Sequence, residues 1–160
     1  MTDTELNGCQ ELAAVCDRIV AADPDIAPRD FLRALGDIVA GIDPGIEGIV
    51  DLARGGANEV YGKGFLPEFD DGSDGQPRHF AGTAASVAIF GGRATEFVAH
   101  TFLDPPDTPD GRLTSAAVDF ATQVIDEELP LTQTADWVLE NLCLPEPETS
   151  AIRIDPRPDS

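Results

Sequence analysis

The sequence predicts an all-α protein: a compact bundle of about six helices around a central helix that is rich in small residues, with an extended C-terminal tail. Apolar residues recur at spacings of three and four along most of the chain, which is typical of amphipathic helices. No pair of segments shows the alternation expected of neighbouring strands. We expect one helical domain over residues 1–144 and a proline-rich, extended or disordered tail over residues 145–160.

Prolines and apolar stripes predict the first three helices. The first helix should end before Asp23–Pro24, and the second should begin at Pro28. Proline is tolerated at the start of a helix because the N–H that it lacks has no partner within the helix there. The third should begin at Pro44, with Asp43 as its N-cap. The residues expected to face the core are Leu6, Cys9, Ala13, Cys16 and Val20, then Phe31, Leu35, Ile38, Val39 and Ile42, then Ile46, Ile49, Val50, Ala53, Ala57, Val60 and Tyr61.

The central helix is expected over about 76–103. Ser73 and Gln76 have the spacing of a capping box at its start, and Gly91–Gly92 is a place for a kink. Many small side chains in this segment allow other helices to approach closely, so we expect Val87 and Phe90 to be buried.

Loops around this helix also carry information. Residues 62–75 contain three apolar side chains that we expect to lie on the core, Phe65, Leu66 and Phe69. Residues 104–111 are predicted to be a rigid connection without helix, because they hold three prolines. Two further helices follow, one ending before Pro130. Their inward residues should be Leu113, Ala116, Ala117, Phe120, Val124 and Ile125, then Trp137, Val138, Leu142 and Cys143.

Acidic residues outnumber basic residues by thirty to ten, which gives a net charge of −20, and Lys63 is the single lysine. Such a chain repels nucleic acids and anionic membranes, so we expect neither as a partner. The charge has two interpretations: adaptation to a salt-rich host or a GC-rich genome, or an acidic surface that binds a basic protein partner.

The three cysteines, Cys9, Cys16 and Cys143, suggest reduced and buried thiols. Cys9 and Cys16 are seven residues apart on one predicted helix, too far for a disulfide. The N-terminal residues lack the pattern of a secretory signal, and the longest apolar run is too short to span a bilayer. These observations predict a cytoplasmic location.

The first candidate site is the acidic segment Asp70–Gly75, which has some features of a calcium loop. With Asp70 as the first position, Asp74 and Gly75 fit, but the twelfth position is Ala81 where a bidentate glutamate is required. An EF-hand is therefore excluded. Asp70, Asp71 and Asp74 remain as binding residues, with occasional divalent-ion binding or helix capping as alternatives.

The second candidate lies at the start of the central helix, where Arg78 and His79 adjoin the acidic loop. Together with Asp71 and Asp74 they could form a catalytic or ligand-binding cluster, because a nearby carboxylate favours the protonated imidazole. The alternative is a structural cluster that joins the loop to the helix.

A third candidate consists of Glu96, His100 and Asp104, which share one face of a straight helix. They are weak candidates for a metal site, since a complete ligand set needs another residue from elsewhere. The alternative is a solvent-exposed face with His100 near the end of the helix.

Motifs for nucleotide, serine-hydrolase or zinc-protease chemistry are absent from the sequence, and no cofactor is expected. We favour an acidic helical protein-interaction module, comparable to an inhibitor, immunity or adaptor protein, that binds a basic or mixed protein surface. The alternative is a small hydrolase or metal-dependent enzyme centred on His79 and residues 68–78, or on Glu96, His100 and Asp104. Whether the protein is an enzyme is left open, with a non-enzymatic role favoured.

Overall fold

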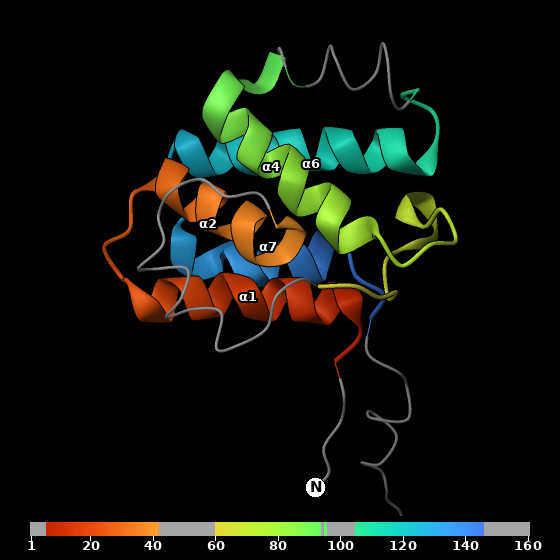
Figure 1. Ribbon diagram of the computed structural model, residues 1–160, viewed down its shortest axis with the longest axis horizontal. Coiled ribbons are helices and arrows are strands. Elements are labelled where there is room, and N and C mark those ends of the chain that lie inside the picture. The colour runs from red at the N-terminus through yellow and green to blue at the C-terminus, as the bar shows by residue number, and fades with distance from the viewer. Residues whose placement is uncertain (1–5, 42–59, 94, 96–104, 146–160) are drawn as a thin grey trace, which may run out of the picture.

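The computed structural model describes residues 6–41, 60–93, 95 and 105–145. These residues contain five α-helices, two short 3-10 helices and no strand, which confirms the predicted all-α class. α1 runs along one side of the molecule and α6 along the opposite side, with α2 and α4 between them (Figure 1). The one β-like contact among these residues is an isolated antiparallel bridge between Phe65 and Cys143.

α1 (Gly8–Ala22) begins with a complete capping box. The Asn7 side chain accepts a hydrogen bond from the Gln10 N–H at 2.8 Å, and the Gln10 side chain accepts one from the Asn7 N–H at 3.0 Å. The prediction that Leu6 faces the core is wrong, because Leu6 precedes the N-cap and is half exposed. The helix buries Gly8, Cys9, Leu12, Ala13, Val15, Cys16 and Ile19.

α2 (Pro28–Ala40) begins at the predicted proline and ends at Gly41, whose φ of 76° suits a residue without a side chain. It packs against α4, and the contact requires a glycine: a Cβ on Gly36 would lie 2.5 Å from the Cβ of Ala85. The predicted third helix lies outside the described residues, apart from its last two positions. Val60 is buried as expected, whereas Tyr61 is exposed.

α4 (Gln76–Phe90) is shorter than predicted. It ends at Phe90, and a φ of 97° at Gly91 interrupts the helix, so the expected continuous helix with a kink is wrong at this point. Gly92, Arg93 and Thr95 are helical again, and residues 94 and 96–103 of the expected helix lie outside the described residues. Val87 is buried as predicted, but the prediction that Phe90 is buried is wrong: as the final residue of the helix it is 71% exposed. The capping box is also wrong, since the N-cap is Gly75 and makes no side-chain hydrogen bond.

α6 (Pro109–Ile125) is capped by the Thr108 hydroxyl, which accepts a hydrogen bond from the Gly111 N–H at 3.0 Å. Residues 109–111 are therefore helical, and the predicted helix-free connection over 104–111 is wrong there; its first residue lies outside the described part. The short helices η1 (Pro67–Phe69) and η3 (Leu131–Gln133) precede α4 and α7 (Thr134–Asn141). Phe65 and Phe69 are buried on the core, as the sequence predicts.

Three aromatic rings join α4, α6 and α7 in the core. The Phe120 ring lies 5.2 Å from Phe80 and 5.0 Å from Trp137, measured between ring centroids. Phe80 and Phe120 are fully buried. The last two helices are thus held against α4 by the inward residues that the sequence identifies.

A disulfide joins Cys9 in α1 to Cys143, which follows α7, with 5.6 Å between the Cα atoms. The expectation that all thiols are reduced is wrong for this pair, because the chain after α7 returns to the start of α1. Cys16 is free and fully buried, and burial raises the pKa of its thiol from 9.0 to about 12 despite a hydrogen bond with Thr134.

Candidate functional site

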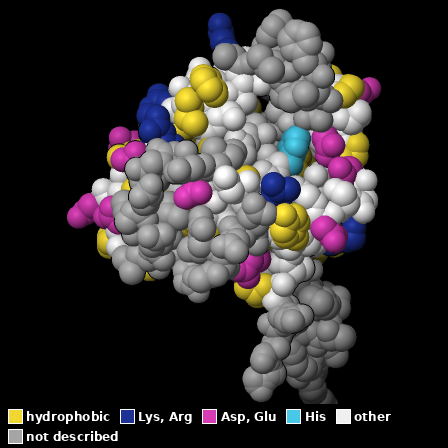
Figure 2. All heavy atoms as spheres, viewed as in Figure 1, with side chains coloured by type: hydrophobic (Ala, Val, Ile, Leu, Met, Phe, Trp, Pro, Cys, Tyr) yellow, Lys and Arg dark blue, Asp and Glu magenta, His cyan; other side chains and the backbone are white. Residues whose placement is uncertain are grey.

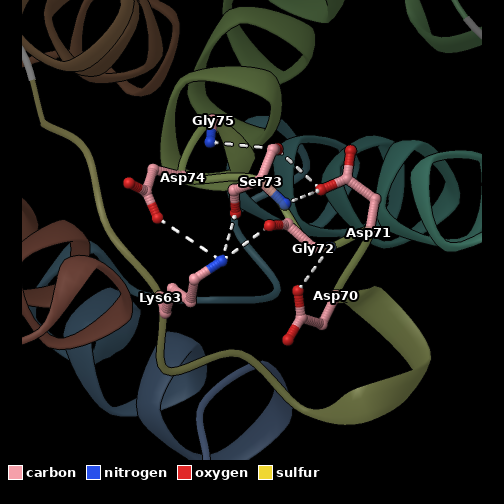
Figure 3. A network of polar contacts seen from close by, with 7 residues as sticks. All are labelled: Lys63, Asp70, Asp71, Gly72, Ser73, Asp74 and Gly75. Carbon is pink, nitrogen blue, oxygen red and sulfur yellow. Dashed lines mark hydrogen bonds and ion pairs between the residues drawn. The ribbon is translucent and has the colours of Figure 1, made fainter.

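The acidic loop of residues 70–75 is closed around the side chain of Lys63 (Figure 3). The Lys63 ammonium donates hydrogen bonds to the carbonyl of Gly72 at 2.7 Å and to that of Ser73 at 3.4 Å. It also lies 3.5 Å from a carboxylate oxygen of Asp74. The ammonium group of the single lysine therefore occupies the position in which a cation would contact the oxygens of the loop.

The remaining carboxylates of this loop hold its backbone. Asp70 accepts a hydrogen bond from the Gly72 N–H at 2.8 Å, and Asp71 accepts from the N–H and the hydroxyl of Ser73 at 2.8 and 2.6 Å (Figure 3). Ser73 in turn accepts from the Gly75 N–H at 3.2 Å. The sequence-predicted binding residues Asp70, Asp71 and Asp74 thus lie on one exposed and internally bonded turn.

Asp71 also reaches Asp110 in the first turn of α6, a partner that the sequence reasoning missed. Partial burial opposes the ionisation of Asp71, but hydrogen bonds with Ser73 and Asp110 outweigh it and lower the pKa of Asp71. Burial and the neighbouring Asp71 raise the pKa of Asp110, although Gln76 and His79 oppose this. The two carboxyl groups therefore have pKa values displaced in opposite directions.

Gln76 connects this pair to the core. Its buried side-chain amide donates hydrogen bonds to the carbonyl of Phe69 and, at 3.1 Å, to a carboxylate oxygen of Asp110. The sequence reasoning assigned Gln76 to a capping box. The structure instead uses it to join η1, α4 and α6.

His79 is half-buried on α4, and its Nε2 lies 2.8 Å from the hydroxyl of the fully buried Thr114 in α6. The adjacent Arg78 places its guanidinium 5.3 Å from the centroid of the Tyr61 ring, which is a cation–π contact. The structure therefore brings Asp71 and His79 towards the same helix, α6, through Asp110 and Thr114. Asp74 is bound to Lys63 on the other side of the loop.

Glu96, His100 and Asp104 lie outside the described residues, so the structure does not place them. Within the described residues, no group of three or more His, Cys, Asp or Glu side chains could hold a metal ion. Helices long and apolar enough to cross a membrane are likewise lacking from the described segments.

A groove of about 360 Å³ lies between α1 and α7. Its floor is formed by alanines, including the buried Ala13 and Ala135. Three exposed leucines line its sides: Leu6 before α1, Leu139 on α7, and Leu144 after α7. The charged residues in its lining are Asp17 and Asp136, one on each helix.

The sequence did not predict this groove, because the groove forms only where α1 and α7 pack together and the pattern of one helix does not show which helix lies beside it. Leu6 was assigned to the core, and Leu139 and Leu144 were assigned to neither core nor surface. The available signal was the position of Leu139, four residues after Ala135 on one helix face.

The acidic side chains do not form one continuous patch on the face that Figure 2 shows. Asp and Glu side chains are spread over several parts of that face, between apolar and basic ones. The net charge of −20 therefore attracts cations to that face as a whole, and the contact surface for a partner must be determined by local side-chain contacts.

Comparison of the chain with protein-family models, curated proteins and solved structures finds no match.

Proposed function

We propose that the protein is an acidic helical interaction module that binds a basic or mixed surface of a partner protein, as an inhibitor, immunity protein or adaptor does. The observation that carries the proposal is the exposed turn of residues 70–75. Asp70 and Asp71 are held by hydrogen bonds within the turn and Asp74 by its ion pair with Lys63, so these carboxylates meet a partner without first being ordered. The large excess of negative charge adds long-range attraction to a cationic partner.

An association-rate measurement tests this function with an arginine-rich peptide as the probe. The variant carries Asp70→Asn, Asp71→Asn and Asp74→Asn, because an asparagine oxygen can accept the same backbone hydrogen bonds without the charge. The matched control neutralises three exposed acids after α6: Asp126→Asn, Glu127→Gln and Glu128→Gln. Both variants lose three charges, so a difference between them reports position.

We expect the association rate to fall as ionic strength rises, and to fall further for the loop variant than for the control. Equal association rates for the two variants would show that the turn does not contribute to the interaction. An association rate that does not depend on salt would contradict the proposed function itself.

A second candidate is a small hydrolase centred on the loop and His79. The specific observation in its favour is the opposite displacement of the Asp71 and Asp110 pKa values, which is a pattern of acid and base pairs. Two observations weigh against this candidate. Nε2 of His79 is within hydrogen-bond distance of the Thr114 hydroxyl, and the groove between α1 and α7 contains neither His79 nor any residue of the acidic loop. If the protein hydrolyses a glycoside, His79→Ala and Asp110→Asn should abolish turnover while the far-UV circular dichroism spectrum still shows the helical fold.

A further inference from the structure

We propose that the groove between α1 and α7 binds an amphipathic helix of the partner protein, whose apolar face enters the groove and whose flanking residues are lysine or arginine. The inference rests on the proposed function for the charge of the partner. It adds a second contact surface, separate from the turn of residues 70–75, and the kind of segment that binds there.

The apolar character of the groove is the first support. Among the described residues, six large hydrophobic side chains are exposed, and three of them, Leu6, Leu139 and Leu144, line this one groove. They come from two distant parts of the chain, one before α1 and one on and directly after α7. Exposed apolar side chains gathered in one place, with polar residues at the rim, are typical of a protein-binding surface.

The shape of the groove favours a helix as the bound element. Its two walls are α1 and the eight-residue α7, which pack directly against each other, and its floor consists of alanines. Small residues on the floor leave room for larger side chains from above. An amphipathic helix in such a groove presents apolar residues at spacings of three and four.

The walls are also fixed before any partner arrives. Cys143, beside Leu144, is joined to Cys9 of α1 by the disulfide. The Leu144 N–H donates a hydrogen bond to the carbonyl of Gly64 at 2.8 Å. A groove that is held open in this way loses little conformational freedom when a partner binds.

Charge complementarity selects the partner. Asp17 on α1 and Asp136 on α7 are exposed and lie on opposite walls, and the lining of the groove contains no lysine or arginine among the described residues. A helix with cations on both sides of its apolar face can approach both carboxylates. An acidic or neutral helix of the same shape would meet repulsion or gain nothing.

The test uses the full chain and three synthetic helical peptides, with binding followed by amide chemical shifts. The first peptide carries leucine on one face and lysine elsewhere, the second replaces leucine with alanine, and the third replaces lysine with glutamate. The protein variant is Leu139→Lys. The matched control is Ile89→Lys on α4, because Ile89 and Leu139 are both 42% exposed.

We expect the leucine–lysine peptide to shift amides of α1 and α7, and Leu139→Lys to weaken its binding at least about tenfold, as loss of a central apolar contact does. Ile89→Lys should bind like the unmodified protein. The alanine peptide should bind weakly, and the glutamate peptide should not bind.

Other outcomes separate the two proposals. Equal binding of the leucine and alanine peptides, with shifts confined to residues 70–75, would overturn the groove and leave the proposed function intact. Binding of the glutamate peptide as tightly as the lysine peptide, or no binding of either lysine peptide, would contradict the proposed function as well.

Two results would identify a different occupant and overturn the proposal. Groove shifts in a full-length Ile152→Asp, Ile154→Asp variant without peptide would assign the groove to the chain's own last residues. Self-association that Leu139→Lys abolishes would assign it to a second copy.

Discussion

Loss of the disulfide between Cys9 and Cys143 is expected to reduce the free energy of unfolding more than any single surface substitution. The two cysteines are 134 residues apart, so the bond closes nearly the whole described chain into one loop. In the chain-entropy description, a loop of this length restricts the unfolded state by about 5 kcal/mol. Residual structure in the unfolded chain reduces this figure, so we expect a loss of roughly 2–5 kcal/mol.

Urea denaturation with and without dithiothreitol measures this loss, with a Cys9→Ala, Cys143→Ala variant as the control. Reductant should lower the stability of the natural chain and leave that of the variant unchanged. Thiol counting provides the independent check. The oxidised protein should show no reactive thiol when folded at pH 8, because Cys16 is buried and its pKa is about 12. Unfolded without reductant, it should show one thiol. Three reactive thiols would refute the pairing.

Three further predictions concern the core and the charges. Phe80→Ala should cost about 3–5 kcal/mol of stability by leaving a cavity beside Phe120, whereas Phe90→Ala should cost under about 1 kcal/mol, as chemical denaturation would show. Melting temperature should rise from low to molar potassium chloride, because salt screens repulsion among the excess negative charges; a flat or falling midpoint would show that they are already well dispersed. The pKa of Asp110 is raised in the folded state, so its contribution to stability is present at low pH and lost as pH rises through that pKa. The stability of Asp110→Asn relative to the natural chain should therefore increase as pH rises through the pKa of Asp110, and a difference that does not vary with pH would contradict the raised pKa.

Local signals were sufficient to predict much of the helical structure. Pro28 marks the start of α2, and apolar residues at helical spacing identify the buried faces of α1 and α6. These signals act within one element, so they can be read from consecutive residues. At Gly91–Gly92 the sequence predicted a kink instead of the end of α4, because small residues on both sides continue the same pattern.

Long-range pairings could not be predicted in this way. The disulfide joins residues near opposite ends of the chain, and the Asp71–Asp110 contact depends on how η1 packs against α6. Spacing arguments tested Cys9 only against its helical neighbour Cys16. The candidate site was therefore half predicted: Asp71 and His79 were identified, while Asp110, Thr114 and the α1–α7 groove depend on tertiary packing.

The location of the protein stays a prediction. Disulfides are rare in the reducing cytosol, so a bond between Cys9 and Cys143 is expected to persist in more oxidising surroundings. The expected cytoplasmic location can be checked by thiol trapping in intact cells. Trapped Cys9 and Cys143 would show that the bond is not formed in those cells.

Isolation of the bound partner from the native host tests the central claim most directly. The unmodified chain, Leu139→Lys and Ile89→Lys would each be used as bait at low and high salt, and the bound proteins would be identified. We predict a partner with a basic amphipathic helix that is retained by the unmodified chain and by Ile89→Lys at low salt, and is lost with Leu139→Lys or at high salt. A partner that all three chains retain equally, or one whose bound surface is acidic, would contradict the account.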